Sequence, residues 1–466
     1  MAVSENFPVR VRIAPSPTGF AHLGTASSAL YNLLFARAHG GTFVLRIDDT
    51  DVERNRPEYE QVIYEGLHWL GLDWDEGPDK SGPVGPYRQS ERLDIYKEHA
   101  ARLIAEDKAY RCYCTAEELD AERKQAQAEK RAYKYSRRCL IDPPHDRSDF
   151  TVRFKVAGGE VKFTDMIRGE MTFDSALIGD FIIVKSDTYP TYNYASPVDD
   201  ATMKITHVIR GEEHLSNTPY QLMVIDALGY ARPQAYAHMP LILANDGSKM
   251  SKRKHPELNL LLYREQGYLP EALINYLVLL GWNPGTSQEI FSFDELVKIF
   301  SFGRVQHGGA RFDWDKLNWI NGEYIRSLSD DELAGRLGLF LPHLDDATIR
   351  RAAPALKTRI SKLADAADLL DYLWTDPTPP ALEPDAASRV RAATEALKDV
   401  PWEPAAIHDA LMGVVQASGL GPNKTFMPIR QALTGKKISP PIDHTLALLP
   451  KEVALSRLAT AAGDSV

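Results

Sequence analysis

Two short stretches of the chain carry side chains that could bind a nucleotide and stabilise charge on its phosphates. The first, HLGT (residues 22–25), follows a strand-like run and a turn rich in proline and glycine, and it begins an apolar helical pattern. The second, KMSKR (residues 249–253), holds three cations close together. The N–H groups at a helix start favour anions, and basic side chains on a loop can stabilise charge that develops on phosphates. Taken alone, His22 could be an ordinary turn histidine and KMSKR a solvated basic loop.

Residues 9–51 predict a βαβ unit that would position the first stretch. The alternating run VRVRI predicts a strand, APSPTG a turn, and the residues from about Thr25 to Ala38 a helix. A second apolar run, TFVLRI, leads into an acidic cluster that begins at Asp48. In a βαβ unit the helix begins at the carboxyl edge of the sheet, where ligands bind. The turn has neither the dinucleotide-binding pattern G-x-G-x-x-G nor the P-loop pattern.

All three cysteines of the chain, Cys112, Cys114 and Cys139, fall close together in the sequence. Three cysteines do not make a disulfide framework, so we expect a reducing, cytoplasmic compartment. A C-x-C pair with a third cysteine nearby favours a metal site over redox chemistry, and zinc prefers four such ligands. Free buried thiols are the alternative.

Composition sets outer bounds on the class of protein. A chain of 466 residues, with 44% apolar and 25% charged residues, predicts two to four globular domains. No apolar run approaches the roughly 18 residues that a membrane span needs, and the N-terminus lacks the pattern of a secretory signal. The net charge of -10 is unfavourable for a nucleic-acid binder, so basic residues must be segregated, as they are in residues 120–138 and 249–254.

The rest of the chain predicts an α/β protein with a helical C-terminal part. The runs TVRFKV and EVKFTD alternate around Gly158 and Gly159 and predict a hairpin, and DFIIVK is expected to return to the main sheet. From Ser327 onward, strand patterns nearly vanish, and a proline-rich break at residues 376–385 divides the helical region into two subdomains.

HLGT and KMSKR, in this order and roughly 220 residues apart, resemble the two ATP-binding motifs of class I aminoacyl-tRNA synthetases. The flanking sequences narrow the resemblance to glutamyl-tRNA synthetases of the bacterial type. These are RIAPSPTG (12–19), GGTFVLRIDDTD (40–51), GPYRQSER (85–92), YPTYNYASPVDD (189–200) and THVIRGEEHLSNTP (206–219).

The resemblance implies a Rossmann-type nucleotide-binding fold with an inserted α+β acceptor-binding domain and an all-helical anticodon-binding region. The expected parts are the catalytic halves 1–88 and 188–243, the insertion 89–187, a KMSKR-loop and stem-contact domain 244–326, and the helical region 327–466. It also implies a cytoplasmic monomer that uses ATP with Mg²⁺ to join L-glutamate to the 3′-terminal adenosine of tRNA(Glu). An all-helical C-terminus argues against glutaminyl-tRNA synthetase and the archaeal-eukaryotic glutamyl type, whose anticodon domains are β-barrels.

Roles carry over to the positions that match the family motifs. The nucleotide would be held by His22, Gly24 and Thr25, and its phosphates by Lys249, Lys252 and Arg253. The glutamate would be held through its side-chain carboxylate by Arg12 and Arg210, with Ser16 and Tyr192 beside them, and through its ammonium group by Asp48. Many relatives have Glu at the position of Asp48, and the Glu side chain is one methylene longer.

The cysteine spacing resembles the zinc site in the inserted domain of some glutamyl-tRNA synthetases. Those enzymes commonly complete the site with a histidine two places after the last cysteine, where this chain has Ile141. Tyr135, four residues before Cys139, matches a tyrosine ligand of a truncated tRNA-modifying relative, and His145 is the other candidate. In the helical region, Arg359 matches an arginine that favours the glutamate anticodon.

Two alternative functions stay open at this point. The first is a non-discriminating enzyme that also charges tRNA(Gln). The second is a non-catalytic tRNA-binding paralogue, which would have no chemical need to keep the lysines of KMSKR.

Overall fold

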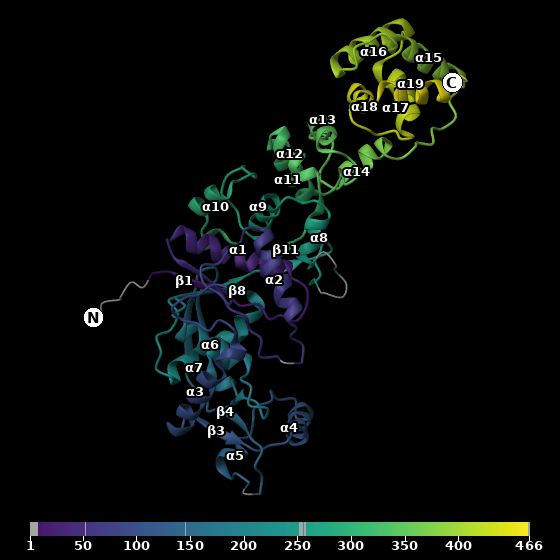
Figure 1. Ribbon diagram of the computed structural model, residues 1–466. Helices are drawn as coiled ribbons and strands as arrows, with labels where there is room; N and C mark the ends of the chain where they lie inside the picture. Colours follow the sequence, from purple (N-terminus) through teal and green to yellow (C-terminus); the bar gives the residue numbers. More distant parts are fainter. Residues whose placement is uncertain (1–7, 52, 145, 251–254, 256–257, 465–466) are drawn as a thin grey trace. The chain divides into compact units, whose positions relative to one another are not determined.

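The computed structural model describes residues 8–51, 53–144, 146–250, 255 and 258–464 (Figure 1). The chain divides into two compact units, the first made of Met1–Leu262 and Ile274–Asp313 and the second of Tyr263–Leu273 and Trp314–Val466. Within the described ranges, no helix has the length and apolar character that a membrane crossing requires.

The first unit is built on parallel strands. β1 (Arg10–Ile13) pairs in parallel with β2 (Thr42–Leu45), and α1 (Leu23–Ala38) connects them. β8 (His207–Gly211) pairs in parallel with β9 (Ala235–Met239), which also meets β5 (Glu160–Asp165). β1 lies beside β8, because the N–H of Thr206 donates to the carbonyl of Arg10 at 2.9 Å. The predicted βαβ unit is therefore confirmed, and its two-stranded sheet lies beside the sheet that holds β8 and β9.

The helix α1 is apolar on most of its surface because it is covered on more than one side. Leu23, Leu30 and Leu34 are completely buried, and the helix packs against β1, β2, β8 and α10 (Phe293–Ile299). A helix with apolar residues around most of its circumference belongs in a core. The position of the HLGT stretch is consequently fixed by packing.

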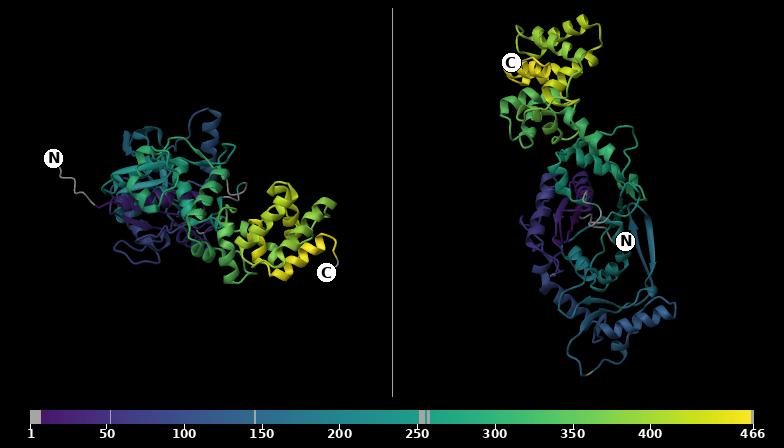
Figure 2. Two further views of the ribbon diagram at one scale, coloured as in Figure 1. Left: turned by 90° about the horizontal axis from the view of Figure 1, so that it is seen from above. Right: turned by 90° about the vertical axis from the view of Figure 1, so that its right-hand side faces the viewer.

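A second sheet differs from what the sequence predicts. β3 (Ala109–Cys112), β4 (Thr151–Phe154) and β7 (Phe181–Val184) form an antiparallel sheet with α4 (Ala116–Ala128) and α5 (Arg138–Ile141) beside it. In Figure 1 and in the right-hand view of Figure 2, this blue segment lies at the end of the first unit away from α1. The expectation that DFIIVK returns to the main sheet is wrong, because β7 pairs with β4.

The predicted hairpin between β4 and β5 is also wrong. Gly158 and Gly159 do turn the chain, with φ of 83° and 111°. However, β4 pairs with β3 and β7, whereas β5 pairs with β6 (Gly169–Asp174) and β9. The burial patterns give the reason: β4 buries three successive residues inside its own sheet, while β5 alternates between buried and exposed and keeps a solvent-facing side.

The remaining elements of the first unit complete its layers. They are α2 (Pro57–Trp69), η1 (Gln89–Arg92), α3 (Leu93–Ala105), η2 (Ser175–Leu177), α6 (Tyr192–Thr202), η3 (Glu212–Asn217), α7 (Thr218–Ala227), β10 (Ile242–Leu243), η5 (Phe302–Arg304) and β11 (Ala310–Arg311). Two more helices, α8 (Leu260–Glu265) and α9 (Pro270–Gly281), hold residues of both units.

The second unit is helical throughout its described residues, as the sequence predicts. Its helices are α11 (Trp314–Ser327), α12 (Asp330–Leu337), α13 (Asp346–Leu356), α14 (Asp365–Leu370), η6 (Asp371–Leu373), α15 (Pro384–Leu397), α16 (Pro404–Ser418), α17 (Pro422–Thr434), α18 (Ile442–Leu448) and α19 (Lys451–Ala461). The proline-rich break falls between η6 and α15, where no helix forms because each proline removes a backbone donor.

A buried network of three arginines and three aspartates ties the elements of the first unit together. Arg46 Nε donates to Asp48 Oδ1 at 2.6 Å and its Nη1 to Asp200 Oδ1 at 2.7 Å. Asp200 also accepts from Arg12, and Asp199 accepts from Arg92 at 2.7 Å. The side chains come from β1, η1, α6 and the segment after β2, and none is more than 6% exposed.

We predict that Arg46→Met lowers the free energy of unfolding of the first unit by about 3–5 kcal/mol, because it leaves buried carboxylates without their partner. The measurement is native-state amide hydrogen exchange of β1 and β2. The matched control, Arg37→Met, removes a half-exposed ion pair to Asp75 and should cost less than about 1 kcal/mol. Equal costs for the two substitutions would contradict the prediction.

Candidate active site

A cavity of about 1030 Å³ lies at the carboxyl ends of β1, β2, β8 and β9. Ligands bind at this edge of open α/β sheets, so its position agrees with the expectation drawn from the βαβ unit. It brings together nine of the residues that the sequence singles out: Arg12, Ser16, His22, Gly24, Thr25, Asp48, Tyr192, Arg210 and Lys249. Lys252 and Arg253 lie outside the described residues.

The HLGT stretch forms the N-terminus of α1. His22 is the N-cap, and its Nδ1 accepts the N–H of Gly24 at 3.0 Å. The N–H groups of Thr25 and Ala26 both bond to the carbonyl of His22, at 2.8 and 3.1 Å. A Cβ at Gly24 would lie only 3.1 Å from His22 Nδ1, so glycine lets the imidazole stay close to the backbone. The positive end of the helix dipole therefore faces the cavity beside an imidazole.

Lys249 reaches the cavity from a tight turn that follows β10. The carbonyl of Ser248 accepts the N–H of Ala244 at 2.9 Å, and Leu243 and Lys249 form an isolated antiparallel bridge. Gly247 takes a φ of 83° within this turn, a conformation that favours glycine. The exposed side chain of Lys249 is thus held at the rim of the cavity.

The two arginines that the resemblance assigns to a carboxylate differ in their partners. Arg12 Nε and Nη2 donate to the two oxygens of Asp200 at 2.9 and 3.2 Å, so the charge of Arg12 is already compensated. Arg210 is 5% exposed, yet within the described part of the chain no carboxylate forms a salt bridge with it. A buried guanidinium with neutral partners only is an electrostatic receptor for an added anion.

Among the described residues, the hydrogen-bond partners of Arg210 are all neutral. Nη1 donates to Gln221 Oε1 at 2.8 Å and to Tyr192 Oη at 3.3 Å. Nη2 donates to Thr218 Oγ1 at 2.9 Å and to the carbonyl of His214 at 3.4 Å. Each terminal nitrogen thus makes one short and one long hydrogen bond. The long ones are weak, so a carboxylate could replace both and bind across Nη1 and Nη2.

Asp48 is paired with Arg46, a residue to which the sequence motifs give no role. Both of its oxygens accept from Arg46, at 2.6 and 3.1 Å. Burial raises the pKa of Asp48 to about 6, although the adjacent charge of Arg46 opposes the rise. At neutral pH the carboxylate is ionised and shares its charge with Arg46, while it also lines the cavity.

Sequence reasoning missed several residues behind the cavity wall. Arg46, Asp199 and Asp200 belong to the buried network, and His238 and Asp165 stand behind Arg210. A local signal exists for Arg46 alone, because it precedes Asp48 by two positions and both fall on one side of an extended chain. The other partners come from distant segments and leave no pattern in the sequence.

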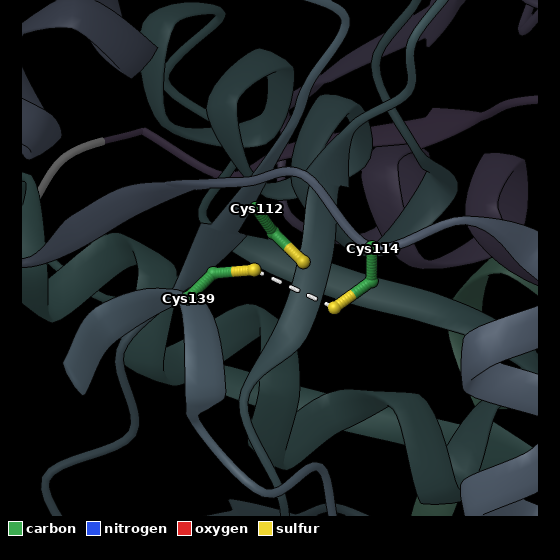
Figure 3. Close-up of side chains that lie close together, drawn as sticks. All are labelled: Cys112, Cys114 and Cys139. Carbon is green, nitrogen blue, oxygen red and sulfur yellow. Dashed lines mark hydrogen bonds between the residues drawn. The ribbon is translucent and has the colours of Figure 1, made fainter. Parts of the chain in front are cut away.

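The side chains of the three cysteines point toward one another (Figure 3). Their sulfur atoms all lie within 4.8 Å of one another, and Cys114 Sγ is 3.5 Å from Cys139 Sγ. Tyr135 Oη lies 3.4 Å from Cys112 Sγ and 3.2 Å from Cys114 Sγ. Ile141, which stands where relatives have a histidine, is 78% exposed, and His145 lies outside the described residues.

A buried guanidinium accompanies this cysteine cluster. Arg153 Nε donates to Cys112 Sγ at 3.2 Å, and the guanidinium carbon lies 3.9 Å from the centre of the Tyr135 ring. Although burial opposes ionisation, hydrogen bonds from Tyr135 and Arg153 lower the pKa of Cys112 to about 7. The surroundings of Cys112 therefore favour negative charge on its sulfur, whereas burial and the neighbouring cysteines raise the pKa of Cys114 to about 12.

Arg359 belongs to the second unit, where it is exposed just after α13. Burial and the positive charge of Arg359 lower the pKa of Arg430 on α17. Two guanidinium groups therefore stand near each other on this unit, a local concentration of charge that attracts phosphate.

Two family descriptions match the chain. "tRNA synthetases class I (E and Q), catalytic domain" covers residues 8–319, and "Anticodon binding domain" covers residues 332–462. The catalytic part and its cavity are therefore those of a class I aminoacyl-tRNA synthetase.

Individual relatives narrow the family. The glutamate–tRNA ligase of Acidothermus cellulolyticus is 46% identical over 97% of this chain and 95% of its own length, and that of Moorella thermoacetica is 44% identical over 97% and 98%. The crystal structure of a glutamate tRNA ligase from Elizabethkingia meningosepticum, in complex with its amino acid, has a TM-score of 0.87 at 34% identity and covers 98% of this chain and 99% of that one. The chain belongs to the glutamate–tRNA ligase family.

Proposed function

We propose that the chain activates L-glutamate with ATP and transfers it to the 3′-terminal adenosine of tRNA(Glu). The observation that carries the choice of amino acid is the buried guanidinium of Arg210, which lines the cavity and has only neutral partners in the part of the chain that the structure describes. A side-chain carboxylate would accept from both terminal nitrogens and supply the missing negative charge. Glutamine would supply no charge, and its amide N–H groups would face N–H groups of the arginine.

The other cavity residues would hold the α-amino acid group and the rest of the ligand. Asp48 would accept the ammonium group while keeping its bonds to Arg46, since each oxygen can accept more than one hydrogen bond. Arg12, neutralised by Asp200, would contribute hydrogen bonds and shape, together with Ser16 and Tyr192.

The nucleotide would bind as its magnesium complex across the start of α1 and the turn after β10. His22, Gly24 and Thr25 present the positive end of α1, and Lys249 approaches from the rim. Lys252 and Arg253 complete the proposed phosphate-binding set on the strength of the sequence. In the attack of the glutamate carboxylate on the α-phosphate, charge builds up on phosphate oxygens as pyrophosphate leaves, so these groups would act by positioning and electrostatics.

ATP–pyrophosphate exchange with glutamate in the presence of tRNA(Glu) tests the activity. We expect Arg210→Ala to raise the KM for glutamate by about 100-fold, since a charge-assisted bidentate contact is lost, and to change the KM for ATP by less than about threefold. Arg37→Ala, in an exposed ion pair outside the cavity, is the control. A wild-type chain without glutamate-dependent exchange would refute the proposal and favour the non-catalytic paralogue.

Choice of tRNA is proposed to depend on the second unit, with Arg359 contacting the anticodon close to Arg430. Charging assays on purified tRNA(Glu) and tRNA(Gln) separate the two enzymatic possibilities. We expect product on tRNA(Glu) alone for a discriminating enzyme. Product on both would identify a non-discriminating one, whose glutamyl-tRNA(Gln) needs a later amidation.

We also propose a structural zinc ion held by Cys112, Cys114, Cys139 and Tyr135. Zn–S bonds of about 2.3 Å in a tetrahedron place sulfurs roughly 3.8 Å apart, which suits a cluster whose sulfurs lie within 4.8 Å of one another. The N–H groups of Tyr113 and Cys139 point at Cys139 Sγ and Tyr135 Oη, at 3.4 and 3.3 Å, as they would toward charged ligand atoms. Arg153 would offset the excess negative charge of three thiolates. Such an ion would cross-link the elements around β3.

Elemental analysis of the purified chain tests the metal. We expect about one zinc per chain in wild type, a loss of zinc in Cys139→Ser, and weaker retention against a chelator in Tyr135→Phe. Tyr133→Phe alters an exposed tyrosine two residues away and should retain the metal. Wild-type protein that neither contains nor takes up zinc would contradict the proposal.

The five-part division given by the resemblance is kept as a proposal, with its boundaries at residues 88, 187, 243 and 326. We further propose that the chain acts as a monomer in the cytosol, where its three cysteines, which form no disulfide, would remain reduced.

A further inference from the structure

Behind Arg210 stands a row of buried polar side chains from adjacent strands. Arg210 on β8 is in register with His238 on β9, and Asp165 ends the neighbouring strand β5. Asp165 is 1% exposed and His238 is completely buried. Neither touches the cavity, and neither is used by the proposed reaction.

Hydrogen bonds fix the proton positions in this row. Asp165 Oδ2 lies 2.7 Å from His238 Nδ1, while Oδ1 accepts the N–H groups of Ile167 and Arg168 at 2.9 Å each. The carboxylate pKa is lowered by these hydrogen bonds despite burial, so it is ionised and accepts from Nδ1–H. His238 Nε2 is then an acceptor, and Arg210 Nε donates to it at 3.2 Å.

The imidazole is neutral as well as oriented. Burial lowers the pKa of His238, and the positive charges of Arg210 and Arg168 act in the same direction, against Asp165. The imidazole also faces the hydroxyl of Thr218, 3.1 Å from Nε2, the stacked ring of Tyr236 and the edge-on ring of Phe163. A neutral acceptor holds the arginine without cancelling its charge, which a carboxylate at the same place would do.

We propose that His238, oriented by Asp165, is a positioning residue for recognition of the substrate carboxylate by Arg210. By occupying Nε, it leaves the Nη1–Nη2 fork as the only pair of nitrogens that can bind a carboxylate bidentately, and it prevents rotation of the guanidinium. The two long bonds of that fork, to Tyr192 and to the carbonyl of His214, are those a ligand would replace. This inference rests on the proposed function, in which that ligand is glutamate.

The test compares three substitutions in the full-length chain by ATP–pyrophosphate exchange. His238→Leu removes the acceptor, and we expect the KM for glutamate to rise by about tenfold or more, with kcat and the KM for ATP within about threefold of wild type. His238→Gln restores a neutral acceptor near Nε2 and should bring the KM for glutamate to within about threefold of wild type.

Asp165→Asn keeps nearly the same side-chain size and shape. It tests the proposal independently if His238→Leu does not fold. The amide would donate to Nδ1 and move the imidazole proton to Nε2, where it opposes the N–H of Arg210, so the KM for glutamate should again rise selectively. His207→Leu is the control, because this histidine lies on β8 and bonds to Thr206 rather than to Arg210.

The outcomes separate the two proposals. An unchanged KM for glutamate in Asp165→Asn and His238→Leu, or an equally raised one in His238→Gln and His238→Leu, would overturn the role of His238. Loss of glutamate-dependent exchange in wild type itself would instead overturn the proposed function.

Discussion

Six buried charges, from Arg12, Arg46, Arg92, Asp48, Asp199 and Asp200, hold separate elements of the first unit at fixed distances from one another. Ions of this kind lose much solvation on burial and recover it only when partners meet at hydrogen-bonding distance. The contacts of 2.6 to 2.9 Å between guanidinium and carboxylate groups join the ends of β1 and β2 to α6 and η1. A buried ion pair adds little net stability over an apolar pair. The main consequence of this network is therefore geometric: it fixes the positions of Arg12 and Asp48, which line the cavity.

Against this background of paired charges, two buried arginines stand out. Arg210 and Arg153 are each 5% exposed, and among the described residues neither has a carboxylate partner. Arg210 faces the cavity, and Arg153 faces the sulfur of Cys112. In both places the fold buries a positive charge that no carboxylate among the described residues balances. At Arg210 the proposed balancing charge is the carboxylate of glutamate. At Arg153 it is the thiolates that would hold the zinc ion.

Prediction from the sequence succeeded where the information was local and failed where it was not. The strand, turn and helix from Val9 to Ala38 and the helical nature of the second unit follow from periodicity and turn chemistry within a few residues. The hairpin around Gly158 and Gly159 was predicted on the same kind of evidence and is wrong, because two glycines allow a turn but do not choose the partner strand. β4 and β5 find their partners through burial in two different sheets.

The sequence by itself determined the family, the βαβ unit and most of the residues that line the cavity, since these are carried by short motifs and local patterns. Only the tertiary structure decided which of those residues retain charge for a ligand. Arg12 meets Asp200, 188 positions away, whereas the described residues that bond to Arg210 are all neutral. The tertiary structure also placed Asp165 and His238 behind Arg210, from strands 73 positions apart. Electrostatic and hydrogen-bonding partners are set by a few ångströms in space, and a linear pattern does not record such distances between remote segments.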